Sequence, residues 1–307
     1  MPAIVYLLTI KIGMDPNIAK FGSLQLTWHG IFTAVGIAAG VYLGAWLGRR
    51  QGITEDDAYS VALVGVPAGI IGARAMYVLE NHARFSGHWV DVLRINEGGI
   101  TVYGAVIGGV VGAVAYGLIR KLPITRGLDA AAFGLLLGMA VGRIGDLING
   151  EHVAKSSGLP WATEYTNPAS PSFTYGPTHP ATTYEMIGDV LIIGIMAFLF
   201  VKLWQHRPGI TFFAGLVLYS AMRFGVSYLR IDSGVACPNS VGCPDHIIKN
   251  WMTFPQVVST ITFAIGTAGL AWTIARGKQR EAVGSVHAAG TPENPLDRKP
   301  AAPRSKP

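Results

Sequence analysis

Seven long apolar segments constrain this chain more than any other feature of its sequence. Each is about 20 residues long, which is the length of helix that crosses the hydrocarbon core of a bilayer. They are too long for membrane-spanning strands, so the sequence predicts an all-α integral membrane protein with about seven transmembrane helices. The expected spans are Leu26–Gly48, Ala58–Leu79, Gly99–Ile119, Asp129–Ile148, Tyr184–Trp204, Ile210–Arg230 and Met252–Ala275.

The charged residues support this prediction and orient the chain. They make up 14% of the sequence, against about 25% in ordinary soluble domains. Of the 24 Lys and Arg residues, fourteen lie after the first, third, fifth and seventh spans, six lie on the opposite side, and four lie in or beside spans. Because Lys and Arg mark cytoplasmic loops, we expect an extracytoplasmic N-terminus and a cytoplasmic C-terminus. This placement argues against nucleic-acid binding as the reason for the net charge of +6.

The predicted organisation has three parts. Residues 1–25 form an extracytoplasmic N-terminal arm, and residues 26–276 form the seven-helix membrane domain. Residues 277–307 are polar and contain proline, which predicts a disordered cytoplasmic tail. Within the membrane domain, the external connection 150–183 is long enough to form a small extracytoplasmic loop subdomain.

The two cysteines fall in the connection after the sixth span. The predicted external side is oxidising, which favours a disulfide between Cys237 and Cys243. Asp245 and His246 follow closely, so a metal site is the alternative, although the ligand pattern is poor.

Glycine recurs at four-residue spacing in three of the predicted spans. The positions are Gly36, Gly40 and Gly44 in the first span, Gly104, Gly108 and Gly112 in the third, and Gly134, Gly138 and Gly142 in the fourth. A face of glycines lets two helices approach backbone to backbone. We therefore interpret these positions as packing surfaces.

Arg143 lies inside the fourth apolar segment, where a guanidinium group is costly. Its penalty near a bilayer centre ranges from ~3 to over ~10 kcal/mol and falls near an interface. Asp146 lies three residues further on the same helical face and could form a structural ion pair with it. An anionic ligand is the other interpretation.

Six spans each carry a polar or charged side chain near the outer end. These residues are His29, Arg74, Tyr103, Arg143, Glu185 and Arg223. At a rise of about 1.5 Å per residue, all lie within about one to three turns of the external interface. Unrelated ion pairs would scatter in depth, so the common depth favours a shared cavity open to the outer leaflet. Arginine binds phosphate through charge-assisted, often bidentate hydrogen bonds, which predicts a phospholipid headgroup as the ligand.

Residues 142–151, Gly-Arg-Ile-Gly-Asp-Leu-Ile-Asn-Gly-Glu, resemble the defining motif of the prolipoprotein diacylglyceryl transferase family. Similar residues follow the family's order along most of the chain, at Gly72-Ala73-Arg74, Tyr77-Val78-Leu79, Arg94–Gly99, His179-Pro180, Tyr184-Glu185, Arg223, Arg230, Gln256 and Ser259. The resemblance implies a transferase of the bacterial plasma membrane. Such an enzyme moves the diacylglyceryl group of phosphatidylglycerol to the lipobox cysteine thiol of a secreted prolipoprotein. A thioether forms and glycerol phosphate leaves, and no cofactor, metal or nucleic acid is implied.

The resemblance and the arginine pattern together give the expected site. The expected catalytic residues are His29, Tyr103, Arg143 and Arg223. The residues expected to bind phosphatidylglycerol are Arg143, Arg74, Asp146, Asn149, Glu151 and Arg230. Arg143 and Arg223 are expected to contact the phosphate.

Four positions depart from the family pattern. Tyr103 replaces a histidine, Asp146 an asparagine and Ser227 a glutamate, whereas His29 stands where the family usually has tyrosine. We hypothesise that His29 and Tyr103 have exchanged roles and face each other across the lipid headgroup. His29 would then be the titratable group nearest the thiol. The alternative is that His29 is a solvated interfacial residue.

Two other functional classes fit parts of the sequence. A transporter or flippase for an anionic lipid would carry charges through the full membrane depth and inverted repeats, which this sequence lacks. A catalytically altered lipid-binding or lipid-transport protein on the same fold would share the features described above.

Overall fold

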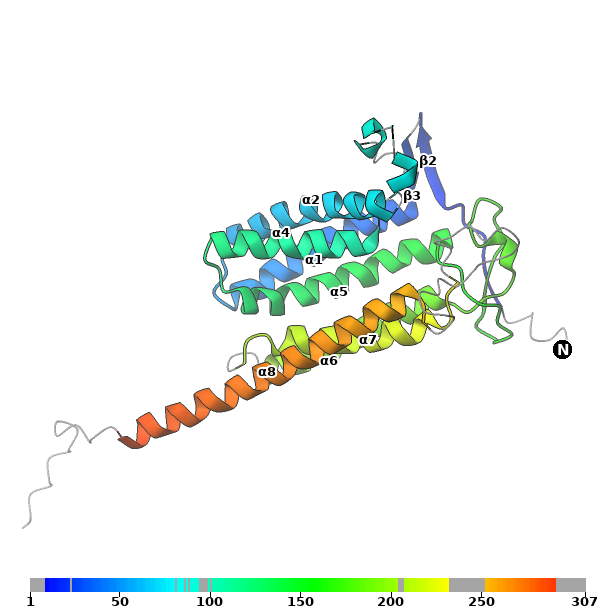
Figure 1. The fold of residues 1–307 in the computed structure, drawn as a ribbon. Helices are drawn as coiled ribbons and strands as arrows, with labels where there is room; N and C mark the ends of the chain where they lie inside the picture. Colours follow the sequence, from blue (N-terminus) through cyan, green and yellow to red (C-terminus); the bar gives the residue numbers. More distant parts are fainter. Residues whose placement is uncertain are drawn as a thin grey trace, which may run out of the picture.

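Seven long helices form most of the described part of the chain in a computed structural model (Figure 1). The structure describes residues 9–22, 24–80, 82–85, 87, 89–93, 99, 101–203, 207–231 and 252–290. The long helices are α1 (Trp28–Arg49), α2 (Glu55–Glu80), α4 (Val102–Ile119), α5 (Ile124–Asn149), α6 (Ala181–Leu203), α7 (Ile210–Ser227) and α8 (Phe254–Gly290). Each predicted span corresponds to one of them, which confirms the predicted fold class.

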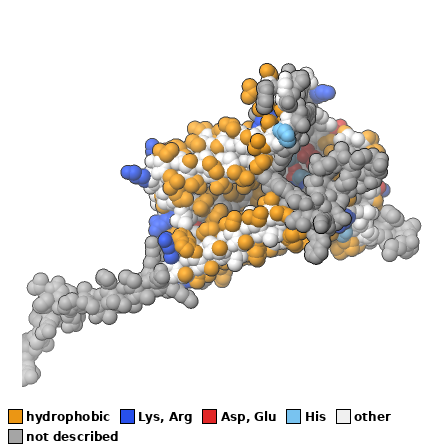
Figure 2. Space-filling view, in the orientation of Figure 1, with side chains coloured by type: hydrophobic (Ala, Val, Ile, Leu, Met, Phe, Trp, Pro, Cys, Tyr) orange, Lys and Arg blue, Asp and Glu red, His pale blue; other side chains and the backbone are white. Residues whose placement is uncertain are grey.

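The surface of these helices is suited to hydrocarbon. Six are long and apolar enough to cross a membrane, and α4 contains a shorter apolar stretch, Gly104–Ile119. Large apolar side chains point outward, with Leu63 76% and Phe198 64% exposed. Figure 2 shows apolar side chains over the side of the bundle and Lys and Arg side chains toward its two ends. A lipid environment stabilises such a surface, and helices satisfy their own backbone groups within it. The chain is therefore a multi-pass membrane protein.

Successive helices run back and forth between the two ends of the bundle (Figure 1). The connections from α1 to α2, α4 to α5 and α6 to α7 lie at one end. The strands and the described parts of the other connections lie at the opposite end, which we call the strand end. This alternation agrees with the predicted order of loops, whereas the side of the membrane that each end faces stays a prediction.

Backbone contacts at glycine pair α1 with α5 and α2 with α4. A Cβ atom on Gly36 would lie 2.5 Å from the carbonyl oxygen of Gly138, and one on Gly104 would overlap the carbonyl oxygen of Gly72. Only glycine permits this approach. The packing role of the glycine faces is confirmed, except at Gly142, where a Cβ would meet no atom within 4 Å.

An apolar core joins α5 to α6 and α7. The rings of Phe133 and Phe200 meet edge to face, with their centroids 5.5 Å apart. Leu136 and Met196 are buried in the same cluster. Close packing of this kind fixes the rotation of each helix about its axis, and so decides which side chains face one another further along the bundle.

Asp129 of α5 caps the N-terminus of α7 at the end opposite the strands. Its carboxylate accepts hydrogen bonds from the N–H groups of Gly209 (2.6 Å) and Phe212 (2.8 Å). The first N–H groups of a helix have no partner within the helix, so this contact ties α7 to α5. Arg143 lies as far along α5 from Asp129 as Arg223 lies along α7 from Gly209. The distance is about 21 Å at a rise of 1.5 Å per residue. The cap therefore sets the two arginines at the same level.

Short strands and turns cover the strand end. β1 (Ile10–Ile12) pairs in parallel with β4 (Thr163–Tyr165), and β2 (Asn17–Phe21) pairs antiparallel with β3 (Leu24–Thr27). The remaining short elements are α3 (His82–Phe85), η2 (Trp89–Leu93) and η4 (Phe173–Tyr175). The sequence predicted a folded connection at 150–183 but none of these strands. The strand pairing joins the N-terminal arm to that connection.

Two helices end at other residues than the predicted spans do. α7 ends at Ser227 rather than Arg230, and Arg230 forms an isolated bridge with Ala154. α8 continues to Gly290, beyond the predicted end of the seventh span at Ala275, whereas the disordered tail stays a prediction. Residues 277–290 contain many good helix formers, including Ala, Lys, Arg, Gln and Glu, which explains the longer helix. Cys237 and Cys243 lie outside the described residues.

Replacing Gly36 by alanine is expected to lower the thermal unfolding midpoint in detergent. The new methyl group would press on the Gly138 carbonyl, and overpacking of this kind costs about 1–3 kcal/mol. Gly194→Ala is the matched control, because a Cβ there meets no atom within 4 Å and alanine favours helix by about 1 kcal/mol. Equal midpoints for the two variants would contradict close α1–α5 packing.

Candidate functional site

The C-terminal end of α5 carries the centre of the site. Arg143, Asp146 and Asn149 follow one another at three-residue spacing, and the helix stops at Gly150, whose φ of 71° is readily adopted by glycine. Gly145 brings the start of α1 against this end. A Cβ there would lie 2.7 Å from the Cα of His29. The small residue therefore places His29 next to Asp146.

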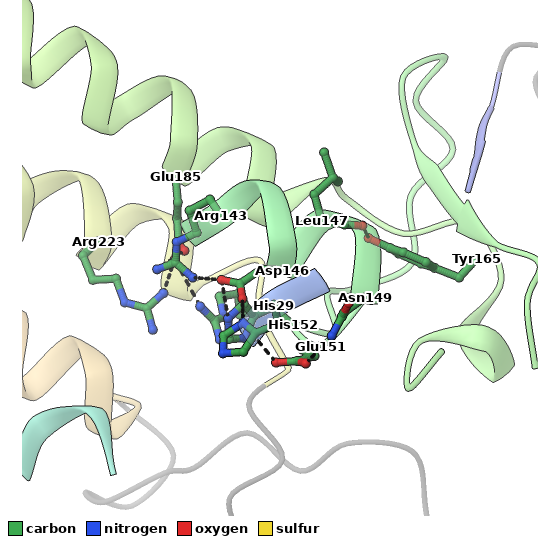
Figure 3. Close-up of polar contacts among 11 residues, drawn as sticks. His29, Arg143, Asp146, Leu147, Asn149, Glu151, His152, Tyr165, Glu185 and Arg223 are labelled. Atoms are coloured by element: carbon green, nitrogen blue, oxygen red, sulfur yellow. Dashed lines mark hydrogen bonds and ion pairs between the residues drawn. The ribbon is translucent and has the colours of Figure 1, made fainter. Parts of the chain in front are cut away.

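Asp146 is the first of two carboxylates around which the polar residues gather (Figure 3). Its Oδ1 lies 2.5 Å from Nδ1 of His29. Its Oδ2 accepts a hydrogen bond from Arg143 at 3.0 Å and lies 3.1 Å from Nε2 of His152. Asp146 is 5% exposed, so a charged form requires these partners.

Glu185 of α6 is the second carboxylate. It forms ion pairs with Arg143 (2.6 Å), with Arg230 (3.2 Å) and with Arg223. Glu185 is 1% exposed. Arg143 bridges the two carboxylates, because one of its nitrogens contacts Asp146 and another contacts Glu185. We call Arg143, Asp146, His152, Glu185, Arg223 and Arg230 the arginine–carboxylate cluster.

His152 makes the second link between the two carboxylates. Its Nδ1 lies 2.7 Å from a guanidinium nitrogen of Arg230, which can only donate, so Nδ1 is the acceptor. Nε2 then carries the proton and donates to Asp146. Burial lowers the pKa of His152 below its ordinary value and outweighs the hydrogen bond to Asp146, while the charge of Arg230 adds to the lowering. His152 is therefore a neutral bridge between Arg230 and Asp146.

The loop after α5 satisfies the last carbonyl groups of that helix. Tyr165 donates to the carbonyl of Leu147 (2.7 Å), Ser170 to that of Asn149 (2.8 Å) and Ser172 to that of Gly150 (2.5 Å). These carbonyls have no partner within the helix. Burial raises the pKa of Tyr165, so its hydroxyl stays a donor.

The same loop holds Arg230, which lies just beyond the end of α7. Ile231 donates to the carbonyl of Val153, and Lys155 donates to that of Leu229, with distances of 3.0 and 2.8 Å. Arg230 lies between these two backbone hydrogen bonds, in its bridge with Ala154. Its position thus depends on backbone pairing and not on the helical spacing from Arg223.

The structure brings most of the expected site residues together. His29, Arg143, Asp146, Arg223 and Arg230 take part in the contacts above. Asn149 and Glu151 lie beside them, with Asn149 donating to Glu151 at 2.7 Å and Glu151 3.5 Å from His29.

Arg74 has a different set of contacts from the cluster. Its guanidinium donates to the carbonyl groups of Asp91 (2.6 Å), Val92 (2.8 Å) and Gly99 (2.8 Å). It thereby holds η2 and Gly99 beside the C-terminal part of α2. Tyr103 lies in the first turn of α4, and its side chain is outside the described residues, so the hypothesis that it faces His29 stays a prediction.

Sequence reasoning missed His152 as a site residue and gave Asp189 no role. His152 directly follows the motif, which was the only available signal. Asp189 lies one turn beyond Glu185 on α6 and is 1% exposed, and within the described structure neither of its carboxylate oxygens has a hydrogen-bond partner. Its spacing of four residues from Glu185 was the signal for a shared helix face.

One group of side chains in the described residues has the composition of a cation site. Donor atoms of His29, Asp146 and Glu151 lie within 4.8 Å of one another. Two ligands at about 2.1 Å from a tetrahedral zinc lie roughly 3.4 Å apart, whereas the His29 and Asp146 atoms are 2.5 Å apart. Their spacing fits a direct hydrogen bond, and we assign no metal to them.

Fold and site together define a multi-pass membrane protein with largely buried arginines gathered at one end of its helix bundle. The sequence model of the family described as prolipoprotein diacylglyceryl transferase matches residues 16–272. The chain belongs to this family.

Relatives from several bacteria extend the same comparison. The chain is similar to proteins named phosphatidylglycerol–prolipoprotein diacylglyceryl transferase, with 30% identity in Nostoc sp. and 32% in both Acaryochloris marina and Symbiobacterium thermophilum. The matches cover 85%, 84% and 86% of this chain and 90%, 90% and 94% of the respective relatives. The likeness therefore extends over nearly the whole length of each relative.

Glu185→Gln is expected to destabilise the protein strongly. The change keeps the shape but removes the negative charge that three guanidinium groups share, and breaking a buried ion pair costs about 3–5 kcal/mol. Thermal unfolding in detergent measures the effect. Glu164→Gln is the control, because Glu164 is more exposed and its ion pair with Lys11 is long, at 3.9 Å. A loss no larger than in the control would show that Glu185 does not hold the arginines together.

Proposed function

We propose that this chain transfers the diacylglyceryl group of phosphatidylglycerol to a cysteine thiol of a prolipoprotein. A thioether forms and glycerol phosphate leaves. The observation that carries the proposal is the convergence of Arg143, Arg223 and Arg230 in a chain of this family. An arginine group of this kind is suited to an anionic phosphodiester at the end of a membrane-spanning bundle.

The arginines would act on the phosphate in two ways. Arg143 and Arg223 would bind the phosphodiester of the intact lipid by exchanging part of their contact with Glu185 for the phosphate oxygens. As the glyceryl carbon separates from oxygen, the phosphate gains a second negative charge. Donors already fixed in a water-poor site stabilise developing charge without reorganisation. Arg230 would add to this field from the side of His152.

The remaining expected residues would hold the headgroup. Asp146, Asn149 and Glu151 offer acceptors and one amide donor near His29, and such groups bind the hydroxyls of a glycerol headgroup. Arg74 would influence lipid binding indirectly, since it holds η2 and Gly99, which precede α4 and Tyr103 in the chain.

The thiol would come from a lipobox segment at the outer face of the bacterial plasma membrane. This side is proposed because Lys and Arg are concentrated after the first, third, fifth and seventh spans, on the other side of the membrane from the site. With this orientation the N-terminus, the strands and the site are extracytoplasmic, and the C-terminus is cytoplasmic.

The alanine variants Arg143→Ala and Arg223→Ala are each expected to weaken phosphatidylglycerol binding by about 1–3 kcal/mol, the range for losing a charged hydrogen bond in a dry site. Both variants should also lipidate a lipobox peptide more slowly. Arg143→Lys should restore only part of the lipid affinity and of the lipidation rate, because an ammonium group lacks the planar fork of a guanidinium group.

The matched control is Arg126→Ala, which removes an exposed arginine at the other end of the bundle. It should bind and turn over normally. Normal lipid binding in both site variants would instead make the arginines purely structural. Absence of lipidation by the unaltered protein would reject the proposed function.

A reporter that works only outside the cytoplasm is expected to be active when fused after Glu151 and inactive after Arg126 or at the C-terminus. The physical reason is the bias of Lys and Arg toward the loops containing Arg126 and the C-terminal tail. The opposite pattern of activity would place the site on the cytoplasmic side.

A further inference from the structure

The hydrogen bond between His29 and Asp146 joins two elements that are far apart in the sequence. Nδ1 of His29, at the start of α1, lies 2.5 Å from Oδ1 of Asp146, near the end of α5. The contact is a histidine–carboxylate pair between the first turn of α1 and the C-terminal part of α5.

The surrounding structure holds this pair in one arrangement. Oδ2 of Asp146 is occupied by Arg143 and His152, which leaves Oδ1 for His29. Thr27 accepts a hydrogen bond from the Gly30 N–H at 3.1 Å and so fixes the first turn of α1. Together with the close approach at Gly145, these contacts set both the carboxylate and the backbone that carries the imidazole.

The geometry also assigns the two ring nitrogens of His29. The described contacts of the ring with carboxylates are made by Nδ1, to Asp146 and at 3.5 Å to Glu151. Facing a carboxylate, Nδ1 is the protonated nitrogen, and Nε2 then carries the free electron pair. The His29 side chain is 41% exposed whereas that of Asp146 is 7% exposed. Nε2 can therefore accept a proton from a group that arrives from outside the cluster.

We infer that His29 accepts the proton of the cysteine thiol and that Asp146 is the residue that positions it, so that this pair forms the basic group of the transfer reaction. The inference rests on the proposed function. It gives Asp146 a role toward His29 rather than only toward the lipid headgroup.

The reaction step balances with these groups. Nε2 takes the thiol proton, and the sulfur forms a bond to the glyceryl carbon that carries the phosphate. The bond between that carbon and the phosphate oxygen breaks, and its electron pair stays on the departing glycerol phosphate. Asp146 stabilises the imidazolium, which then releases its proton to water. The thiolate is the reactive form of cysteine, so the step needs a base at this place.

The test compares two peptides that differ in one atom. A lipobox peptide with cysteine needs a base, whereas the same peptide with selenocysteine is already ionised at neutral pH. His29→Phe is expected to lower the rate with the cysteine peptide by about 10²–10⁴-fold, the usual contribution of a base. Its rate with the selenocysteine peptide and its KM for phosphatidylglycerol should stay close to those of the unaltered protein.

Asp146→Asn tests the positioning role. It should lower the cysteine rate more than the selenocysteine rate, whereas a merely structural role would lower both equally. Imidazole added to His29→Ala should restore part of the cysteine rate. His82→Phe is the matched control, since His82 is exposed in the short helix α3 and should leave both rates unchanged.

Equal losses with the two peptides, or full activity of His29→Phe, would overturn the inference. Inhibition of the unaltered protein by a chelator would also overturn it, because His29, Asp146 and Glu151 would then hold a metal ion. An unaltered protein that lipidates neither peptide would reject the proposed function instead.

Discussion

The carboxylate of Glu185 forms ion pairs with guanidinium groups that reach it from three parts of the chain. Arg143 comes from α5, Arg223 from α7 and Arg230 from the segment beyond α7. Each buried ion would cost several kcal/mol without a partner, so these segments must meet at α6 for the bundle to close. The Asp129 cap enforces the same relation from the opposite end, because it fixes the level at which α5 and α7 run side by side.

This arrangement means that the arginines are already occupied before any anion arrives. A phosphate would enter by replacing carboxylate oxygens around donors that are in place, so binding is an exchange of one anion for another. Such an exchange disfavours weakly charged ligands, since their contacts with the arginines are weaker than the Glu185 ion pairs that are lost. The neutral bridge at His152 extends the coupling, because it connects Arg230 to Asp146 and therefore to His29.

The sequence was sufficient for features that depend on local spacing. Apolar length gave the seven helices, four-residue spacing gave the glycine faces, and three-residue spacing gave the Arg143–Asp146 pair. It was insufficient where position depends on partners remote in sequence. Arg230 is placed by pairing with Ala154, and His152 by a loop whose side chains cap α5. Arg74 lies at a depth that suggested the site, but depth alone could not reveal that its guanidinium turns toward backbone carbonyls.

The glycine contacts affect how a lipid with two acyl chains could reach the proposed headgroup site. Where Gly36 meets Gly138 and Gly72 meets Gly104, backbone touches backbone and there are no side-chain rotamers to rearrange. Each of the α1–α5 and α2–α4 pairs is therefore expected to move as one rigid unit. Any lateral opening for substrate has to form between these two helix pairs or beside α6, α7 and α8, where longer side chains can change rotamer.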